Sequence, residues 1–193
     1  MDDIVRQAMA KWPHVPHCYG WLGLDARGHW YMRDDRAQSL GPFASCDGGT
    51  LGSKGAVLRH DKLIEFIHRN YDRDAQGQWY FQNGPQRVYV ELEVTPWVLR
   101  IAADLRVSTH TGQPVQAHAA WTDEQGRVYL DTDAGLGLVH SLDVGLAAQG
   151  IEAGLWPLQE TSSDALPARF GYERSPQRRQ ALDNTAAGNK KPA

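Results

Sequence analysis

The sequence predicts an α+β protein that is β-rich, with antiparallel meanders, a duplicated unit and one main helix packed between the two sheets. Three observations predict this class. A turn pattern recurs three times at equal spacing, one segment alternates apolar and polar residues as a half-buried strand does, and one segment has helical apolar spacing.

The recurring pattern is Asp-x-x-Gly followed by residues of high strand propensity. The copies begin at Asp25, Asp74 and Asp123, with 49 residues from one copy to the next. The aspartate can accept hydrogen bonds from backbone N–H groups that follow it, and the glycine tolerates the positive φ of a bulged hairpin. Each copy therefore predicts a hairpin tip. The equal spacing indicates an internal duplication, with chance recurrence of a common turn as the alternative.

Helical spacing of apolar residues occurs twice in the first half of the chain. Residues 3–11 predict a short helix, and residues 60–70 predict the main one, capped by Asp61. Between them, residues 20–24 and 29–33 are expected to form the hairpin around the first tip. The segment 34–58, rich in glycine and serine, is expected to be a loop.

The second half of the chain is expected to be an antiparallel meander. In residues 87–94 the apolar positions Val88, Val90, Leu92 and Val94 alternate with Tyr89, Glu91 and Glu93. Asn83-Gly84 is a strong two-residue hairpin signal before this strand. Asp143 is expected to cap a short helix that ends at Gly150. Further strands are expected at 78–82, 97–107, 115–121, 127–131 and 136–142.

These elements suggest four segments. Residues 1–19 form an N-terminal helix and proline-rich lead-in, and residues 20–70 form a first hairpin-and-helix unit. Residues 71–160 form a second antiparallel unit. Residues 161–193 carry six basic against three acidic side chains and few large apolar ones, which predicts a largely disordered tail.

Composition excludes several classes. The chain has 193 residues, 41% of them hydrophobic, a net charge of −3 and two cysteines. This balance makes nucleic acid an unlikely partner, and two cysteines exclude a disulfide scaffold. No apolar run is long enough to span a membrane, and Met-Asp-Asp lacks the basic start of a secretory signal. We therefore expect a cytoplasmic protein without membrane contact.

The order of several short motifs resembles that of an uncharacterised bacterial domain-of-unknown-function family with two repeated α/β units, the second superficially pleckstrin-homology-like. The motifs are Gly28-His29-Trp30, Leu63 to Phe66, Asp74 to Tyr80, Arg87 to Glu91, Glu93-x-x-Pro96-Trp97-Val98 and Gly150 to Ala153 with Leu158. The resemblance implies a duplicated core, a site for a nucleotide-like ligand between the units, and a regulatory rather than catalytic role. The chain departs from the family in its long 34–58 segment and in His68-Arg69-Asn70-Tyr71, which puts the nature of the ligand in doubt.

A candidate anion site follows the glycine-rich stretch 48–55, which lacks the Gly-Lys-Ser/Thr order of a nucleotide-binding P-loop. Free backbone N–H groups, nearby cations and the start of the main helix favour negative charge there. The expected function is a non-catalytic ligand-binding or regulatory module for an anionic nucleotide-like ligand at the inter-unit cleft. The resemblance adds two tryptophans as flat surfaces. The expected ligand-binding residues are Lys54, Arg59, His60, Lys62, Arg87, Trp30 and Trp97.

Two alternatives remain from other functional classes. The first is a protein–protein adaptor that pairs through an exposed strand edge or exposed aromatic side chains. The second is a small hydrolase that uses Glu91 and Glu93 or a metal bound by His14, His17 and Cys18. Prolines flank the histidines and no metalloprotease or zinc-ribbon motif is present, so we expect no metal, no cofactor and no catalytic residue.

Overall fold

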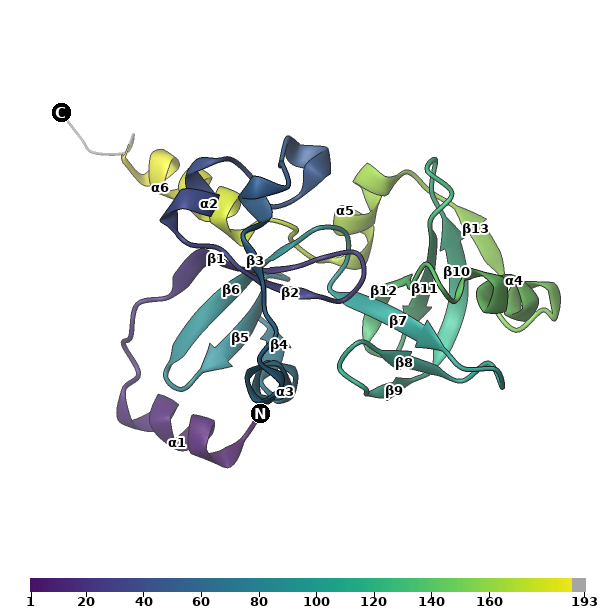
Figure 1. The fold of residues 1–193 in the computed structure, drawn as a ribbon, viewed down its shortest axis with the longest axis horizontal. Helices are drawn as coiled ribbons and strands as arrows, with labels where there is room; N and C mark the ends of the chain where they lie inside the picture. The colour runs from purple at the N-terminus through teal and green to yellow at the C-terminus, as the bar shows by residue number, and fades with distance from the viewer. Residues whose placement is uncertain (189–193) are drawn as a thin grey trace. The chain divides into compact units, whose positions relative to one another are not determined.

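The computed structural model describes residues 1–188 and has the expected α+β class, with two β-sheets and several helices (Figure 1). The chain divides into two compact units. Among the described residues, the first comprises 1–24, 30–93 and the segment from 173 to 188, and the second comprises residues 25–29 and 94–172. The division after residue 93 differs from the expected boundary after residue 70, because the strands on both sides of the main helix join one sheet.

The first unit contains a six-stranded sheet in the order β3-β2-β1-β6-β5-β4. Each half is an antiparallel three-stranded meander, and the two halves meet where β1 pairs in parallel with β6. The strands are β1 (Cys18–Leu24), β2 (Trp30–Met32), β3 (Ala56–Val57), β4 (Tyr71–Arg73), β5 (Trp79–Asn83) and β6 (Gln86–Leu92).

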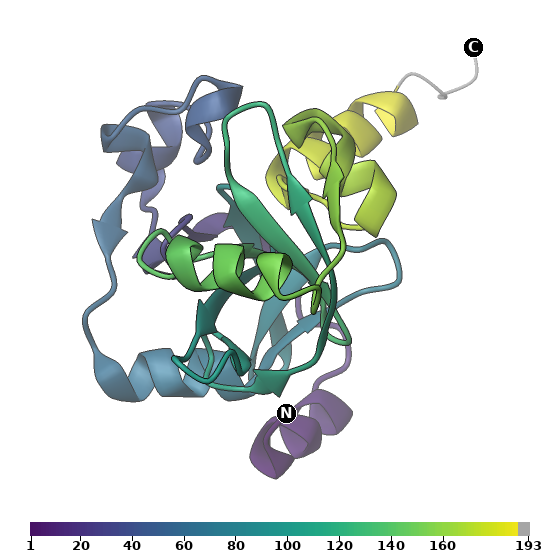
Figure 2. The same cartoon turned by 90° about the vertical axis from the view of Figure 1, so that its right-hand side faces the viewer.

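The second unit contains a seven-stranded sheet in the order β13-β10-β11-β12-β7-β8-β9. The helix α4 (Val144–Glu152) lies against one face of it (Figure 2). The strands are β7 (Trp97–Ile101), β8 (Val107–Thr109), β9 (Pro114–Val115), β10 (Ala117–Thr122), β11 (Val128–Thr132), β12 (Gly135–Val139) and β13 (Leu158–Glu160).

The two sheets share one topology. In each, two three-stranded meanders follow one another, and the last strand of the second meander pairs in parallel with the first strand of the first. A shift of 49 residues carries β5 onto β11 and the start of β6 onto the start of β12. The duplicated unit expected from the sequence is therefore present, with β13 as an additional edge strand in the second sheet.

All three Asp-x-x-Gly copies are hairpin tips with the same hydrogen bonds. Asp25, Asp74 and Asp123 each accept two backbone N–H groups, from the residues two and four positions later. The glycine of each copy has a positive φ, between 73° and 84°. The tips connect β1 to β2, β4 to β5 and β10 to β11, so the local chemistry of the pattern decides the turn in each case.

The helices of the first unit agree with the sequence except in their details. Helices α1 (Asp3–Lys11) and α3 (Asp61–Arg69) form as expected, but the His60 ring, rather than Asp61, accepts the N–H of Leu63 at the start of α3. The expected loop 34–58 contains α2 (Asp35–Ser39) and the short 3-10 helices η1 (Ser45–Asp47) and η2 (Gly52–Lys54). The buried Arg33 guanidinium orders this segment by donating to the carbonyl oxygens of Gly41 and Ser53.

The helix α4 begins after Asp143 as expected, but this aspartate does not cap it. Its carboxylate instead accepts hydrogen bonds from the Arg100 guanidinium at 2.6 Å and from the N–H of Ile101. The Arg100 hydrogen bond is the largest cause that holds the pKa of Asp143 below its ordinary value; burial opposes this shift, and the Ile101 bond adds to it. Asp143 therefore ties the start of α4 to β7.

The expected disorder of residues 161–193 is wrong for the part that the structure describes. This stretch contains η3 (Ser163–Ala165), α5 (Leu166–Phe170) and α6 (Pro176–Gly188). Leu166 and Tyr172 are buried, and the aromatic ring of Phe170 packs edge-on against Trp121. A few apolar anchors thus order a segment of low average hydrophobicity, while residues 189–193 lie outside the described residues. None of the helices in residues 1–188 has the length and apolar character that crossing a membrane requires.

Candidate binding site

One face of the first sheet is apolar, and strand register decides which side chains share it. Met32 lies directly across from Leu22, and Phe81 lies directly across from Val88. Leu22 is also the register partner of Val90, two residues from Val88 on β6. Because side chains alternate along a strand, all of these residues point to the same side of the sheet.

Helix α3 covers only part of this apolar face. Its nine residues span about 13 Å, whereas six strands spaced by about 4.8 Å extend much further. Ile67 of α3 is buried, and His68 accepts a hydrogen bond from the Trp30 indole N–H at 3.0 Å. Burial lowers the pKa of His68, which agrees with a neutral ring accepting that bond. The part of the face near Met32 and Leu22 is left open.

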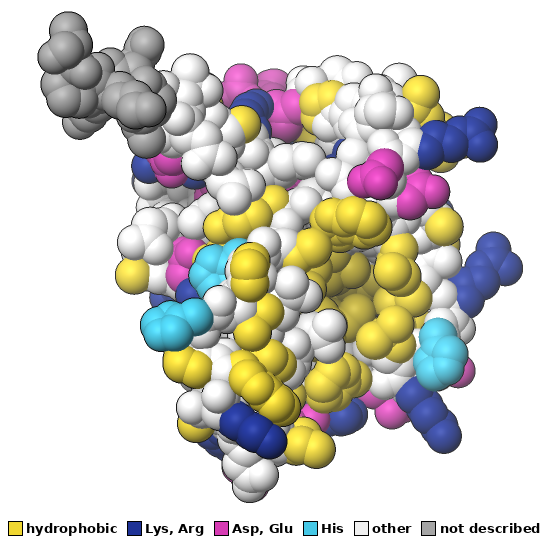
Figure 3. All heavy atoms as spheres, turned by 90° about the vertical axis from the view of Figure 1, so that its left-hand side faces the viewer, with side chains coloured by type: hydrophobic (Ala, Val, Ile, Leu, Met, Phe, Trp, Pro, Cys, Tyr) yellow, Lys and Arg dark blue, Asp and Glu magenta, His cyan; other side chains and the backbone are white. Residues whose placement is uncertain are grey.

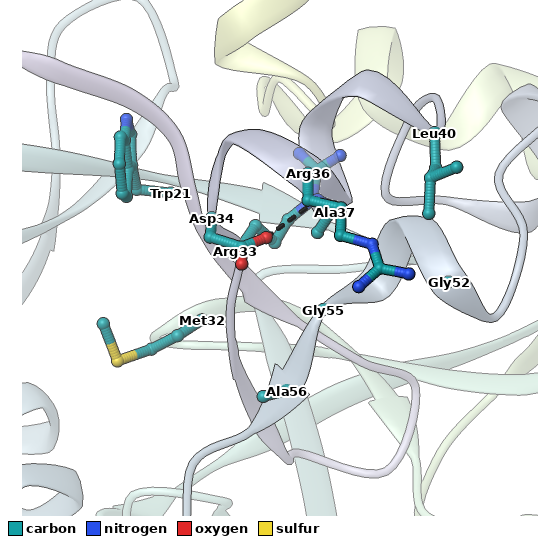
Figure 4. A pocket seen from close by; sticks show the side chains of 10 residues that line it. All are labelled: Trp21, Met32, Arg33, Asp34, Arg36, Ala37, Leu40, Gly52, Gly55 and Ala56. Atoms are coloured by element: carbon teal, nitrogen blue, oxygen red, sulfur yellow. Dashed lines mark hydrogen bonds between the residues drawn. The ribbon is translucent and has the colours of Figure 1, made fainter.

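The uncovered region contains two cavities that share Trp21 and Met32. The smaller cavity, about 220 Å³, is lined by Cys18, Trp21, Leu22, Met32, Leu58, Leu63, Ile67, Phe81, Asn83 and Val88. The larger, about 460 Å³, is lined by Trp21, Met32, Arg33, Asp34, Arg36, Ala37, Leu40, Gly52, Gly55 and Ala56. We call the two together the sheet groove. Figure 3 shows the face of the molecule that carries the smaller cavity, where a hollow lies among hydrophobic side chains. Figure 4 shows the larger cavity from close by.

Large apolar side chains of the sheet groove are exposed to solvent. The residue exposure is 41% for Trp21 and 50% for Met32, and Leu40 at the far side of the larger cavity is 52% exposed. Contiguous exposed apolar surface is uncommon on soluble domains and marks sites of interaction. The sheet groove is therefore the strongest candidate site in the described part of the first unit.

The charged groups of the sheet groove lie in the larger cavity. Arg33 is buried and donates to backbone carbonyl oxygens, while Asp34 accepts the N–H of Ala37 and caps α2. Arg36 is exposed on α2, and Figure 4 shows its side chain extending toward the Gly52–Gly55 segment. The charged lining residues at this end of the sheet groove are thus two guanidinium groups and one carboxylate.

The opposite face of the first sheet is polar and aromatic. Tyr19 stacks on Tyr89 with ring centroids 4.5 Å apart, and the Tyr89 hydroxyl donates to the Asp74 carboxylate at 3.0 Å. Burial and the hydrogen bond to Asp74 raise the pKa of Tyr89 to about 12, although Arg87 opposes the shift. Arg87 lies 4.4 Å above the Tyr80 ring. This face therefore holds closely packed, mutually bonded groups.

Glu91 on the same face is buried and holds the C-terminal segment. Its two carboxylate oxygens accept the Ser175 hydroxyl at 2.5 Å and the Gln177 N–H at 2.9 Å. Burial raises the pKa of Glu91 above its ordinary value, although these hydrogen bonds and the nearby Arg33 oppose the shift. Glu91 thus has a structural role, and it is not a solvated member of a catalytic carboxylate pair with Glu93.

Among the expected ligand-binding residues, Lys54 forms a close ion pair. Its Nζ lies 2.6 Å from the Glu93 carboxylate, and both side chains are more than four-fifths buried. The Glu93 charge therefore offsets the lysine charge. Arg59, His60 and Lys62 are exposed around the start of α3, where the His60 ring already accepts the Leu63 N–H.

The other expected residues lie elsewhere. Arg87 points to the opposite side of the first sheet from Val88 and α3, about 20 Å along β6 from Glu93. Trp30 is buried beneath α3, and Trp97 is buried in the second unit, where its indole N–H donates to the Ala134 carbonyl at 2.8 Å. Neither indole offers an open face of the kind that stacking on a ligand requires.

The proposed metal ligands do not form a recognised cluster. In the described part of the chain, no group of three or more histidine, cysteine, aspartate or glutamate side chains is arranged to hold a metal ion. His17 instead packs edge-on against the Tyr89 ring, and Cys18 lines the sheet groove. Burial raises the pKa of the Cys18 thiol, which keeps it protonated at neutral pH.

Sequence reasoning missed the residues that form the sheet groove. Trp21, Met32 and Arg36 stood in an expected hairpin and an expected loop, without a motif. One signal was present: the apolar positions of the first hairpin and of β6 are more numerous than one nine-residue helix can cover. The strand order is needed to tell where on the sheet the uncovered apolar residues lie.

Comparison with known families decides the affiliation of the chain. A family profile described as "Protein of unknown function (DUF2946)" matches residues 1–177. The chain belongs to this family. The match confirms the expectation of a family of unknown function, and it ends at Gln177, the residue whose N–H Glu91 accepts. No curated protein matches the chain at a significant level.

Two solved structures of DUF1285 family proteins are similar to the chain. The protein from Silicibacter pomeroyi DSS-3 has a TM-score of 0.45 and 13% identity, covering 77% of this chain and 84% of its own. The protein from Shewanella baltica OS155 has a TM-score of 0.43 and 16% identity, covering 67% of this chain and 91% of its own.

Proposed function

We propose that the first unit is a non-catalytic binding module that takes an apolar ligand in the sheet groove. The observation that carries the proposal is the pair of cavities that share Trp21 and Met32 and are lined mainly by apolar side chains. The larger cavity, about 460 Å³, has the volume of a small-molecule site, roughly 300–1,000 Å³, and the smaller adds about 220 Å³; such sites are concave and mostly apolar.

Burial of the groove side chains would supply the binding energy. Complete burial of one large apolar side chain contributes about 1.5–3 kcal/mol relative to its exposed state. Trp21 and Met32 are about half exposed, so a ligand that covers both gains a substantial part of that energy. The ligand also fills the smaller cavity, where Phe81 and Val88 form the floor.

An anionic nucleotide-like ligand has weaker support than an apolar one. Its binding requires several cations near one another, but Glu93 neutralises Lys54, and Arg87 points to the other side of the sheet. The exposed cations Arg59 and Lys62 stand at the start of α3. We therefore keep the proposal of a ligand-binding module but replace the nucleotide-like ligand with an apolar one.

Titration with the neutral dye Nile red, whose fluorescence rises in apolar surroundings, tests the proposal. We expect saturable binding of one dye per chain. Met32→Glu places a charge between the two cavities, and because Met32 is half exposed the variant should fold. We expect it to weaken dye binding at least tenfold, with an unchanged circular dichroism spectrum.

Leu142→Glu is the matched control, because Leu142 is an apolar residue of the second unit with 78% exposure. It should leave dye binding unchanged. Equal binding by the wild-type protein and Met32→Glu, or no saturable binding by the wild-type protein, would contradict the proposed function.

A further inference from the structure

We infer that the ligand of the sheet groove is a free amphiphile: an aliphatic chain with one anionic head group, the head at Arg36 and the chain directed toward α3. This inference rests on the proposed function and names its ligand class. It follows from the distribution of charge in the groove, which is confined to one end.

The charged end is the larger cavity. No hydrogen bond or ion pair of the Arg36 guanidinium is found within residues 1–188, although its backbone carbonyl accepts the Ser39 hydroxyl. The neighbouring carboxylate of Asp34 is bonded to the Ala37 N–H and closes the first turn of α2. A guanidinium group presents a planar set of donors that suits a carboxylate or a phosphate.

Arg33 adds a second positive charge in the same cavity. Its guanidinium donates to the carbonyl oxygens of Gly20, Gly41 and Ser53, which are neutral acceptors. The carboxylate of Glu91 acts electrostatically on Arg33 and offsets part of its charge. The Arg36 guanidinium, for which no ion pair is found within residues 1–188, is therefore the group that would meet the anionic head.

The apolar end is the smaller cavity. Its lining carries few hydrogen-bonding groups besides the Asn83 amide, the Cys18 thiol and the Trp21 indole. From Met32 on β2 to Phe81 on β5 the groove crosses β1 and β6, a path of three strand spacings or about 14 Å. An extended aliphatic chain of medium length matches this path, because it needs no polar partners.

The test compares dodecanoate with dodecanol, which has the same chain but no charge, in displacing Nile red below their aggregation concentrations. We expect the acid to bind the wild-type protein about tenfold more tightly, the effect of one hydrogen bond to a charged group. Arg36→Gln should remove this preference and leave dodecanol binding unchanged. Arg36→Lys should restore part of it.

Arg59→Gln is the matched control, because Arg59 is an exposed arginine of the same unit that does not line the groove. It should keep the preference for the acid. Equal affinity for acid and alcohol in the wild-type protein would overturn the inference while the proposed function stands. If neither compound displaces bound dye, the ligand class is wrong. If Nile red itself fails to bind, the proposed function fails with it.

Vesicles of an anionic phospholipid separate a free amphiphile from a membrane surface. We expect dodecanoate to bind and the protein not to sediment with the vesicles. Sedimentation that Met32→Glu abolishes, without binding of monomeric dodecanoate, would overturn the inference in favour of a membrane contact.

Discussion

The two sheets have the same strand order but differ at one matched position. In the first sheet, Cys18 of β1 pairs with Val88 of β6, and both line the sheet groove. In the second sheet, Trp97 of β7 pairs with Gly137 of β12, and Trp97 is buried. The second sheet thus has a large side chain where the first has a small one.

The glycine opposite Trp97 belongs to the same contrast. A Cβ atom added to Gly137 would lie 2.5 Å from the Leu99 side chain, so the glycine makes room for close packing. At the next matched position on the same face, Leu99 of β7 and Leu22 of β1 are both buried. The two sheets therefore share a strand order and part of a packed face, and they differ where Trp97 stands in place of Cys18.

Trp97→Ala should give the largest effect. The substitution empties a packed position and should lower the free energy of unfolding by about 3–5 kcal/mol. Chemical denaturation measures the loss, and hydrogen exchange should locate it in residues 94–172. The matched variant Cys18→Ala removes a small side chain beside an open groove, and we expect less than about 1 kcal/mol. Equal losses of stability for Trp97→Ala and Cys18→Ala would contradict the difference in packing between the two positions.

Removing the tip aspartates should give the next largest effect, and the second unit should lose more. The Asp123 carboxylate accepts the Tyr129 hydroxyl at 2.6 Å and the Arg127 guanidinium at 2.7 Å. Asp123→Ala leaves that buried hydroxyl without an acceptor and should cost about 2–3 kcal/mol. Asp74→Ala likewise removes the acceptor of the Tyr89 hydroxyl, but this bond is longer, at 3.0 Å, and lies at a more exposed tip, so the loss should be smaller, about 1–2 kcal/mol. Melting temperatures at pH 7 test this order. A greater loss of stability for Asp74→Ala than for Asp123→Ala would contradict it.

The ionised Asp123 carboxylate should also make stability depend on pH in the acid range, which Asp123→Asn tests. Burial favours the protonated form of Asp123, but the Tyr129 and Arg127 bonds outweigh it and lower the pKa below 3.8. A carboxylate with a lowered pKa in the folded state adds stability above its unfolded pKa, and this stability is lost as the pH falls through the folded value. The difference between wild type and Asp123→Asn should therefore shrink below about pH 4.

His68 should make the stability of the first unit depend on pH. Burial lowers its pKa below 6.5, so the unfolded chain takes up the proton first as the pH falls. The stability is complete above the unfolded pKa and is lost as the pH falls toward the folded value. We expect a loss of about 1 kcal/mol from the Trp30 hydrogen bond, measured by denaturation between pH 7.5 and pH 5, values that bracket the histidine range.

His68→Gln keeps an acceptor for the Trp30 indole but does not titrate, and it should remove this pH dependence. His118→Gln, an exposed histidine of the second unit, is the control and should retain it. A His68→Gln protein with the wild-type pH profile would assign the effect to another group.

Met32→Ala should have the smallest effect on stability. Because Met32 is half exposed, we expect a change within about 0.5 kcal/mol. Leu24→Ala on the same face, where the side chain is fully buried, should cost about 2–5 kcal/mol. Denaturant midpoints compare the two. A large loss for Met32→Ala would mean that the open part of the face contributes to the fold.

Much of the architecture could be predicted because short stretches of sequence determine it. The apolar alternation around Val88 and Val90 predicted β6, and the Asp-x-x-Gly copies predicted three tips. Elements ordered by distant contacts were missed. The short helices after Arg33 depend on its buried guanidinium, and the C-terminal segment depends on Glu91, far away in the sequence.

The candidate site was predicted less well for a related reason. Lys54 and Arg59 are close together in sequence and suggested one anion site. In the structure Lys54 is paired with Glu93, whereas Arg59 is exposed near the start of α3. The sheet groove instead arises from Leu22, Met32 and Phe81, which strand order brings to one face, and Trp21 also lines it. A groove of this kind depends on what a helix leaves uncovered, and no local pattern encodes that.

The bonds of Glu91 to Ser175 and Gln177 have a consequence for biosynthesis. The first unit is interrupted at residue 93 and resumes only at residue 173. Ser175 and Gln177 therefore reach Glu91 only after all of residues 94–172 have been synthesised. Until then water would hydrate this carboxylate, and binding of the C-terminal segment replaces that water with two protein donors.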